Sequence, residues 1–455
     1  MNLKNKKVLV IGLAVTGVPL VKTLCQLGAQ VIINDLKAEI DLKENIKELQ
    51  GLEYKSIFGR HPENFSELGE LDLVVVSPGI PLDIPFILEL RKRKINIIGE
   101  IELAYRLNKA PIVAITGTNG KTTTTALVGR ILQSLDKRVF VVGNIGIPAI
   151  SKALETTGED IMVMEVSSFQ LESIVDFRPK VAALLNLTPD HLNRHKTVDN
   201  YLQTKLKIFD KQKSNDFAII NYDDKKCRES SKKILSRKIF FSTKNKLDEG
   251  VFIEKNNIVV LIDNQKHEII HIDEIGIPGI HNLENALAAT AIAFVMGINA
   301  GIIKEGLTNF RGVEHRIEHV TSLDGIKFIN DSKATNTDAA IKAIETIKKQ
   351  IILLAGGMDK GSDFGSFVKA FNGRVKKLFV YGETAPNIYN TCKKMGYQDV
   401  FLVKDLQEAV LNAYNIAEEG DTILLSPACA SWDMYRNFEE RGKHFKTIVK
   451  SLRGS

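Results

Sequence analysis

The stretch from Pro111 to Arg130, PIVAITGTNGKTTTTALVGR, constrains the fold of this chain more than any other. An apolar run, a glycine-bearing turn and a helical pattern follow one another, which is the strand–loop–helix order of a phosphate-binding loop. Backbone N–H groups and the helix dipole hold the anion there, and a lysine adds positive charge near the β- and γ-phosphates. A helix N-cap that happens to contain a lysine is the alternative. We expect a nucleoside triphosphate to bind at Gly117, Thr118, Asn119, Gly120, Lys121, Thr122 and Thr123.

Short apolar runs alternate with helical patterns along most of the 455 residues, which is typical of parallel sheets with crossover helices. A chain of this length is also too long for one hydrophobic core. We expect an α/β protein with a Rossmann-like N-terminal domain over 1–107, a central P-loop ATPase-type domain over 108–312 and a C-terminal Rossmann-like domain over 313–455. In the central domain, VFIEKNNIVVLIDNQKHEII predicts a β-hairpin at Asn256-Asn257.

Composition argues against several other classes of protein. Lysine and arginine number 61 against 55 acidic residues, and the lysines are spread along the chain, which favours solvated surfaces over a nucleic-acid-binding stripe. The four cysteines form no C-x-x-C pair, so neither a disulfide framework nor a zinc site is supported. Two glycines interrupt the signal-peptide-like start, and no apolar run reaches the roughly 20 residues that span a bilayer. We expect a cytoplasmic monomer that binds no nucleic acid and does not insert into membranes.

A second glycine motif, VLVIGLAVTG, follows Lys7. It resembles a dinucleotide fingerprint with Ala14 in place of the second glycine, and Asp35 follows at the end of the next predicted strand. The motif alone suggests NAD. No hydride-transfer constellation accompanies it, and the chain carries a separate phosphate loop, so an NAD-dependent dehydrogenase is the weaker interpretation.

The sequence TGTNGKTT resembles the ATP loop of the Mur ligases and of the related folylpolyglutamate synthetases, which have no glycine at the position of Ile115. The segments GNIG, MEVSSFQLE, DHLNRH, HNLENALAA, EHRIE, NDSKATN and SPACASWDMYRNFEERG also resemble Mur ligases and occur in order. The resemblance implies amide-bond formation through an acyl phosphate in peptidoglycan precursor synthesis. Its implied substrates are ATP, UDP-N-acetylmuramoyl-L-alanine and D-glutamate.

The resemblance also implies roles for residues that local patterns leave ambiguous. By themselves, Glu165, His191 and Lys205 are ordinary as a strand end, a helix cap and a surface lysine. The implied catalytic residues are Lys121, Glu165, His191, Lys205 and Lys333. Two Mg²⁺ ions are implied, with Thr122, Glu165, His191 and Lys205 as ligands. Lys205 is implied to carry a carbamate formed with CO₂, which turns a cation into an anion, whereas Lys207 is expected to be ordinary. Asn193 departs from the aspartate of the family pattern, so no charge is expected there.

Substrate contacts follow from the same resemblance. The UDP-linked substrate is expected at Val15, Thr16, Asp35, Asn144 and Ser167. The third domain is expected to complete the ATP pocket, with Asn285 and Arg316 at the adenine, Asp331 at the ribose and Lys333 near the phosphates, so that domain closure would complete the site. D-Glutamate is expected at Thr335, Lys360, Ser431 and Phe438. Arg316 could instead form a hinge salt bridge, and Phe438 could belong to the core.

Two further functions remain open from sequence alone. Another ligase of the Mur or folylpolyglutamate type would bind ATP but not uridine nucleotides, if it came from the folate branch. A non-enzymatic nucleotide-dependent protein would bind ATP and release no ADP with any substrate combination.

Overall fold

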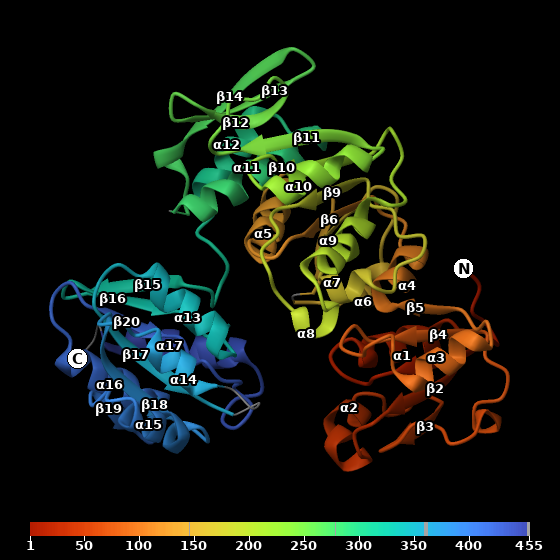
Figure 1. Ribbon diagram of the computed structural model, residues 1–455, viewed down its shortest axis with the longest axis horizontal. Helices are drawn as coiled ribbons and strands as arrows, with labels where there is room; N and C mark the ends of the chain where they lie inside the picture. The colour runs from red at the N-terminus through yellow and green to blue at the C-terminus, as the bar shows by residue number, and fades with distance from the viewer. Residues whose placement is uncertain (145, 278, 359–362, 453–455) are drawn as a thin grey trace. The chain divides into compact units, whose positions relative to one another are not determined.

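The structure is a computed structural model that describes residues 1–144, 146–277, 279–358 and 363–452. It divides into two compact units, Met1–Phe310 and Arg311–Ser455 (Figure 1). The α/β class predicted from the alternation of apolar runs and helical patterns is confirmed, because three largely parallel sheets are flanked by helices. Within the described residues, no helix is long and apolar enough to cross a membrane.

The first sheet of unit 1 is parallel, with strand order β3-β2-β1-β4-β5. Loops at the carboxyl ends of β1 and β4 face each other where the strand order reverses, which is where open α/β sheets bind ligands. Its strands are β1 (Lys7–Ile11), β2 (Gln30–Asp35), β3 (Tyr54–Phe58), β4 (Leu73–Val76) and β5 (Ile97–Gly99). Its helices are α1 (Gly17–Gln26), α2 (Lys43–Lys47), α3 (Pro85–Lys92), α4 (Glu100–Leu107) and the 3₁₀ turns η1 (Glu39–Leu42) and η2 (Phe65–Glu67).

The central sheet, also in unit 1, has nine strands in the order β14-β13-β12-β11-β10-β9-β6-β8-β7. The strands are β6 (Ile112–Thr116), β7 (Val139–Gly143), β8 (Ile161–Glu165), β9 (Val181–Leu184), β10 (Phe217–Asn221), β11 (Arg237–Ser242), β12 (Gly250–Glu254), β13 (Asn257–Ile262) and β14 (Gln265–His271). The helices are α5 (Lys121–Leu132), α6 (Ile150–Ala153), α7 (Ser168–Leu171), α8 (Leu192–His195), α9 (Val198–Leu206), α10 (Lys225–Ser230), α11 (Ile280–Val295), α12 (Ala300–Asn309) and the 3₁₀ turns η3 (Lys207–Phe209), η4 (Ser231–Lys233) and η5 (Ile272–Glu274).

The predicted hairpin is present, but its turn lies one residue earlier than expected. β12 pairs with β13 in antiparallel fashion, and the turn residues Lys255 and Asn256 have φ angles of 50° and 61°. Two successive positive φ angles are typical of the two-residue turn that matches strand twist. Asn257 is the first residue of β13 and pairs with Glu254.

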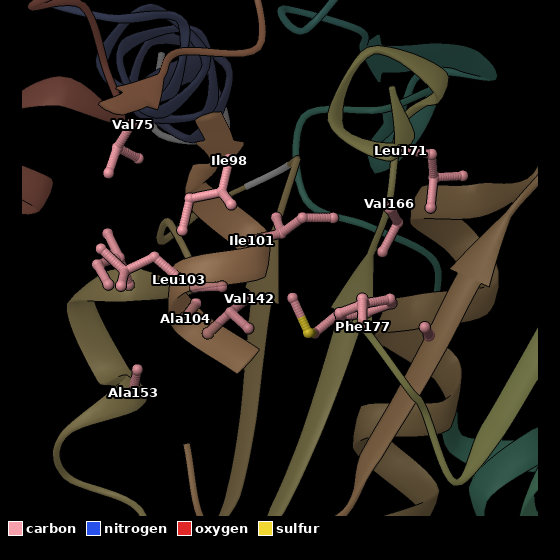
Figure 2. Close-up of a cluster of buried hydrophobic side chains, with 14 of the residues drawn as sticks. Val75, Ile98, Ile101, Leu103, Ala104, Val142, Ala153, Val166, Leu171 and Phe177 are labelled. Carbon is pink, nitrogen blue, oxygen red and sulfur yellow. The ribbon is translucent and has the colours of Figure 1, made fainter. Parts of the chain in front are cut away.

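One continuous core joins the two sheets of unit 1. Figure 2 shows side chains from β4, β5 and α4 packing together with Val142 of β7 and with Phe177 from the segment that precedes β9. The carboxylate of Glu102 on α4, which is fully buried, accepts backbone N–H groups from Val175, Asp176 and Phe177 at 2.8–3.1 Å. Apolar burial and satisfied buried charge therefore both fix the first sheet to the central one.

Unit 2 contains a six-stranded sheet in the order β15-β16-β20-β17-β18-β19. Along β17, Ile352 and Leu354 belong to one buried cluster while Leu353 and Ala355 belong to the other, as the period of two in a strand requires. Its strands are β15 (Glu318–Leu323), β16 (Ile326–Asn330), β17 (Ile351–Gly356), β18 (Val375–Tyr381), β19 (Val400–Leu402) and β20 (Thr422–Leu425). Its helices are α13 (Thr337–Thr346), α14 (Phe364–Lys369), α15 (Ala385–Lys394), α16 (Leu406–Ile416) and α17 (Phe438–Ser451).

Candidate functional site

The phosphate loop lies between β6 and α5, as the sequence predicts. β6 is buried along its whole length, Gly120 has a φ of 82°, and α5 begins at Lys121. A Cβ atom on Gly120 would lie 2.2 Å from Asn285 Oδ1, so the turn is shaped for glycine. The Lys121 amine donates to the carbonyl oxygens of Gly117 (2.9 Å) and Thr118 (2.8 Å), which keeps the positive charge over the loop.

The side chains of Thr122, Glu165 and Asn144 form a hydrogen-bonded group beside this loop. Glu165, at the end of β8, is 2% exposed. One carboxylate oxygen accepts from Thr122 Oγ1 at 2.9 Å and the other accepts from Asn144 Nδ2 at 2.8 Å. A hydroxyl and a carboxylate in contact are hard ligands of the kind that Mg²⁺ prefers. Thr122 and Glu165, each expected as a Mg²⁺ ligand, are therefore in contact, and their chemistry fits the ion.

Lys205 lies on α9 and reaches the same loop from the other side. It is 1% exposed, and its amine donates to Gly117 O at 2.9 Å and lies 3.4 Å from Thr116 Oγ1. Burial, followed by the positive charge of Lys121, holds the pKa of Lys205 well below its ordinary value. Two lysine amines thus converge on one carbonyl oxygen, and no local pattern in the sequence indicates that Lys205 is buried.

His191 occupies a more exposed position, although it is the predicted ligand of a second ion. Its side chain is 48% exposed, its φ is 51°, and its ring packs 4.9 Å from that of Phe169. Tyr201 contacts both sides of the site, because its ring lies 6.4 Å from His191 and 4.7 Å from Lys205 Nζ. Asn193 is exposed. Across the described ranges, no group of three or more His, Cys, Asp or Glu side chains is arranged to hold a metal. Mg²⁺ here would rely on few protein ligands plus phosphate oxygens, as is usual for this ion.

Asn285 corrects one prediction. It lies on α11 in unit 1, in the same compact unit as Lys121, and its Oδ1 accepts from Thr124 Oγ1 at 3.2 Å. The expectation that the third domain supplies Asn285 is wrong, because α11 packs directly against α5.

Asn186, which the sequence analysis did not single out, also holds the phosphate loop: its Oδ1 accepts from Asn119 N at 2.8 Å.

The first glycine loop is built around a carboxylate. Asp35 Oδ2 accepts from Leu13 N at 2.7 Å, and Oδ1 accepts from Lys37 N at 2.9 Å. The structure therefore brings Asp35 to the loop that contains Val15 and Thr16, and Val15 is 75% exposed there. The other two residues expected at the UDP-linked substrate lie in the central part of unit 1. Asn144 contacts Glu165, and Ser167 caps α7 by accepting from Gln170 N at 3.3 Å.

In unit 2, the predicted nucleotide residues surround the end of β16. The buried Asp331 accepts from Ser426 Oγ at 2.8 Å and from Ile317 N at 3.2 Å, and burial raises its pKa to about 7. Arg316 is exposed and lies between two residues with positive φ, His315 and Ile317. Lys333 Nζ lies 5.9 Å from the centre of the Phe438 ring.

The predicted amino-acid residues of unit 2 are linked through a residue that sequence reasoning missed. Arg441 on α17 is fully buried and donates to the carbonyl oxygens of Ser332 (2.9 Å) and Cys429 (3.1 Å). Ser332 Oγ in turn donates to Phe438 O at 2.8 Å. The segments that carry Thr335, Ser431 and Phe438 are thereby held together, whereas Lys360 lies outside the described residues. Nothing local marks Arg441, since its partners are up to 109 positions away.

Three family models match the chain. They are described as Mur ligase MurD-like, N-terminal domain (residues 6–99), Mur ligase middle domain (115–293) and Mur ligase, glutamate ligase domain (315–429). Among solved structures, UDP-N-acetylmuramate-alanine ligase from Thermotoga maritima is 21% identical, with a TM-score of 0.57 over 98% of this chain and 99% of that one. A pseudomurein peptide ligase type C from Methanothermus fervidus is 22% identical, with a TM-score of 0.55 over 98% and 100%. These structures share the fold.

Similar sequences cover the whole chain. The UDP-N-acetylmuramoylalanine–D-glutamate ligase of Alkaliphilus metalliredigens is 61% identical over 455 residues, which is 100% of both chains. The protein of the same name from Clostridioides difficile is 50% identical, again over 100% of both. Full-length identity of this size, together with the three domain matches, establishes that this chain belongs to the Mur ligase family.

Proposed function

We propose that this protein is an ATP-dependent ligase that joins D-glutamate to UDP-N-acetylmuramoyl-L-alanine in peptidoglycan precursor synthesis. The observation that carries the proposal is the convergence of Lys121 and Lys205 on Gly117 O, beside the Thr122–Glu165 pair. Full-length relatives named for this reaction support it. We further propose domain boundaries at 1–107, 108–312 and 313–455, and a cytoplasmic location because ATP and nucleotide-linked sugars are made there.

The chemistry needs a leaving group better than hydroxide. A carboxylate oxygen of the L-alanyl group attacks the γ-phosphorus of ATP, the bond to the β-phosphate oxygen breaks, and ADP departs. The amine of D-glutamate then attacks the acyl carbon, inorganic phosphate departs, and the amine loses a proton. The first step is mainly positioning and charge neutralisation. Lys121 supplies the fixed positive charge, and the N–H groups at the start of α5 hold the phosphates.

Mg²⁺ bound at Thr122 and Glu165, with His191 and Lys205 serving a second ion, would neutralise phosphate charge. The amine of Lys205 would form a carbamate with CO₂. The ammonium groups of the buried Lys205 and the half-buried Lys121 would repel each other next to one carbonyl oxygen, whereas a carbamate anion would attract Lys121. The lowered pKa of Lys205 supports this modification, because only the neutral amine attacks CO₂.

Substrate groups are assigned to the loops described above. The uridine diphosphate would bind at Val15, Thr16 and Asp35, and the remainder of that substrate would extend to Asn144 and Ser167. Asn285, Arg316 and Asp331 would contact the nucleoside of ATP, with Lys333 near its phosphates. D-Glutamate would be held by Thr335, Lys360, Ser431 and Phe438.

Phosphate release is the decisive measurement. Purified protein with ATP, Mg²⁺ and UDP-N-acetylmuramoyl-L-alanine should release phosphate with D-glutamate and far less with L-glutamate, because inversion of an anchored amino acid swings its amine away from the acyl carbon. Mass spectrometry of the product should show one added glutamate. A preference for L-glutamate would overturn the proposal. ATP binding without binding of the uridine nucleotide would favour a ligase of the folylpolyglutamate type instead.

A further inference from the structure

Arg194 ties together two loops of unit 1 that come from different sheets. Its guanidinium donates to the backbone carbonyl oxygens of Gly79 (3.2 Å) and Ile80 (2.9 Å), in the loop after β4. The same group donates to both carboxylate oxygens of Glu172, at 2.6–3.2 Å. The side chains of Arg194 and Glu172 are only 14% and 17% exposed. This contact is therefore a shielded, multidentate one, unlike a solvated surface pair.

The loop after β4 reaches the first glycine loop directly. Ser77 Oγ donates to Gly12 O at 2.8 Å, and Thr16 Oγ1 lies 3.4 Å from Ser77 Oγ. A Cβ atom on Gly12 would lie 2.9 Å from Ile80 Cδ1, so the two loops are already in close contact. A ligand that binds at Gly12 and Thr16 therefore acts on residues in direct contact with the loop whose carbonyl groups accept from Arg194.

Arg194 and His191 contact the same aromatic ring, that of Phe169. The guanidinium carbon lies 4.9 Å above the Phe169 ring, and the His191 ring packs 4.9 Å from the same Phe169. Arg194 N also donates to His191 O at 3.0 Å within α8, which has four residues. A helix this short has no stability of its own. His191 therefore immediately precedes a short helix whose side-chain anchor is Arg194, and it shares the Phe169 ring with the Arg194 guanidinium.

We propose that Arg194 is a positioning residue that couples the nucleotide loop of the first sheet to the segment that carries His191. This inference rests on the proposed function. When the UDP-linked substrate settles against Gly12 and Thr16, the loop after β4 orders Arg194, and Arg194 orders residues 190–196. Lysine cannot replace it, because a compact ammonium lacks the planar fork that reaches two carbonyls and a carboxylate together.

Hydrogen exchange tests this coupling without turnover. Wild type, Arg194→Lys and the control Arg178→Lys are compared with and without UDP-N-acetylmuramoyl-L-alanine, in the absence of ATP and metal. Arg178 is a matched control because its Nε also donates to a buried carboxylate, that of Asp216, at 2.7 Å. Arg178 precedes β9, whereas His191 follows the other end of that strand, so the control lies away from His191. In wild type and the control, the substrate should slow exchange at 190–196. In Arg194→Lys that slowing should fall by about fivefold or more, the lower range of coupling between sites, while slowing at residues 12–17 persists.

Kinetics provide a second test. Arg194→Lys should lower kcat by roughly a hundredfold, the loss expected from a misplacement of about 1 Å, with little change in KM for ATP. Glu172→Gln leaves the bonds from Arg194 to the carbonyl oxygens of Gly79 and Ile80 in place, so it should lower kcat by a smaller factor. This variant provides the test if Arg194→Lys folds poorly. Substrate-induced slowing at 190–196 that survives in both variants would overturn the inference. Failure of wild type itself to bind the UDP-linked substrate would instead overturn the proposed function.

Discussion

Two strand–turn–helix segments of unit 1 share a backbone plan but differ in the charge that fixes the turn. Between β1 and α1, the carboxylate of Asp35 accepts Leu13 N, and residues 12–17 contain no cation. Between β6 and α5, the amine of Lys121 donates to two loop carbonyls, and Thr122 contacts Glu165. Both helix starts can attract an anion. The backbone alone can thus attract an anion at both turns, but only the turn before α5 adds a lysine and a hydroxyl bound to a carboxylate, so we expect phosphate transfer at that turn and only binding at the other.

The largest effect that would separate the two loops is expected from Lys121→Ala. Loss of a preorganised positive charge should lower kcat/KM for ATP by about 3–4 kcal/mol, without unfolding, because Lys121 is not part of the core. Thr16→Ala in the other loop should raise only the KM for the UDP-linked substrate. Steady-state kinetics with each substrate varied will measure both. Near-normal phosphate release by Lys121→Ala would remove the distinction between the loops.

Replacement of Lys205 should have the next largest effect. Lys205→Ala and Lys205→Arg should both lose most activity, since neither side chain can form a carbamate, while small carboxylic acids should partly restore Lys205→Ala. Lys207→Ala is the matched control, because its amine donates to Glu172 O at 3.2 Å and is not assigned to the site. Phosphate release with and without added carboxylic acid will decide. An active arginine variant would contradict the prediction.

Matched glycine substitutions should separate the loops by substrate. Gly120→Ala places a Cβ 2.2 Å from Asn285 Oδ1, and Gly12→Ala places one 3.0 Å from Ser77 Oγ, both at positive φ. Each change should raise one KM by about tenfold, equivalent to 1–2 kcal/mol of strain. Gly120→Ala should affect ATP, and Gly12→Ala should affect the UDP-linked substrate. If both variants affect both substrates equally, the two loops do not bind separate nucleotides.

The smallest effect on catalysis is expected from Glu100→Gln, which tests how the two sheets are joined. Burial raises the pKa of Glu100 to about 7, although its carboxylate accepts Ile150 N at 2.8 Å. The unfolded value is near 4.3, so the folded state binds more protons between these values and the free energy of unfolding falls as pH rises from about 4 to 7. The loss is bounded by roughly 4 kcal/mol.

Glutamine cannot ionise, so Glu100→Gln should flatten this dependence and be the more stable protein above pH 7. Melting temperatures at pH 5 and pH 8 will show it, with the exposed Glu159→Gln as the control. An unchanged slope in Glu100→Gln would mean that Glu100 already ionises in the fold.

Sequence patterns predicted the structural features that are set by residues close together in the chain. The strand, turn and helix around Lys121 were predictable because period and glycine placement are local signals, and the hairpin was displaced by only one residue. The placement of Asn285 failed because helix partners are set by long-range packing. The burial of Lys205 was not predictable, because lysine usually lies on the surface, yet this side chain belongs to a residue that is 1% exposed. Arg194 and Arg441 carry no local signal, since their partners lie 22 to 116 and 11 to 109 positions away.

The strand order of unit 2 has a consequence for how the chain emerges from the ribosome. β20 lies between β16 and β17, yet Thr422 is synthesised about 66 residues after Gly356 ends β17. At roughly 5–20 residues per second, β17 waits about 3–13 s with an unpaired inner edge before β20 exists, and β16, which is made earlier, waits longer. Arg441, which gathers Ser332 and Cys429, is made later still. Unit 2 is therefore the last part of the nascent chain to complete its sheet, and the edges of β16 and β17 need protection until β20 has been made.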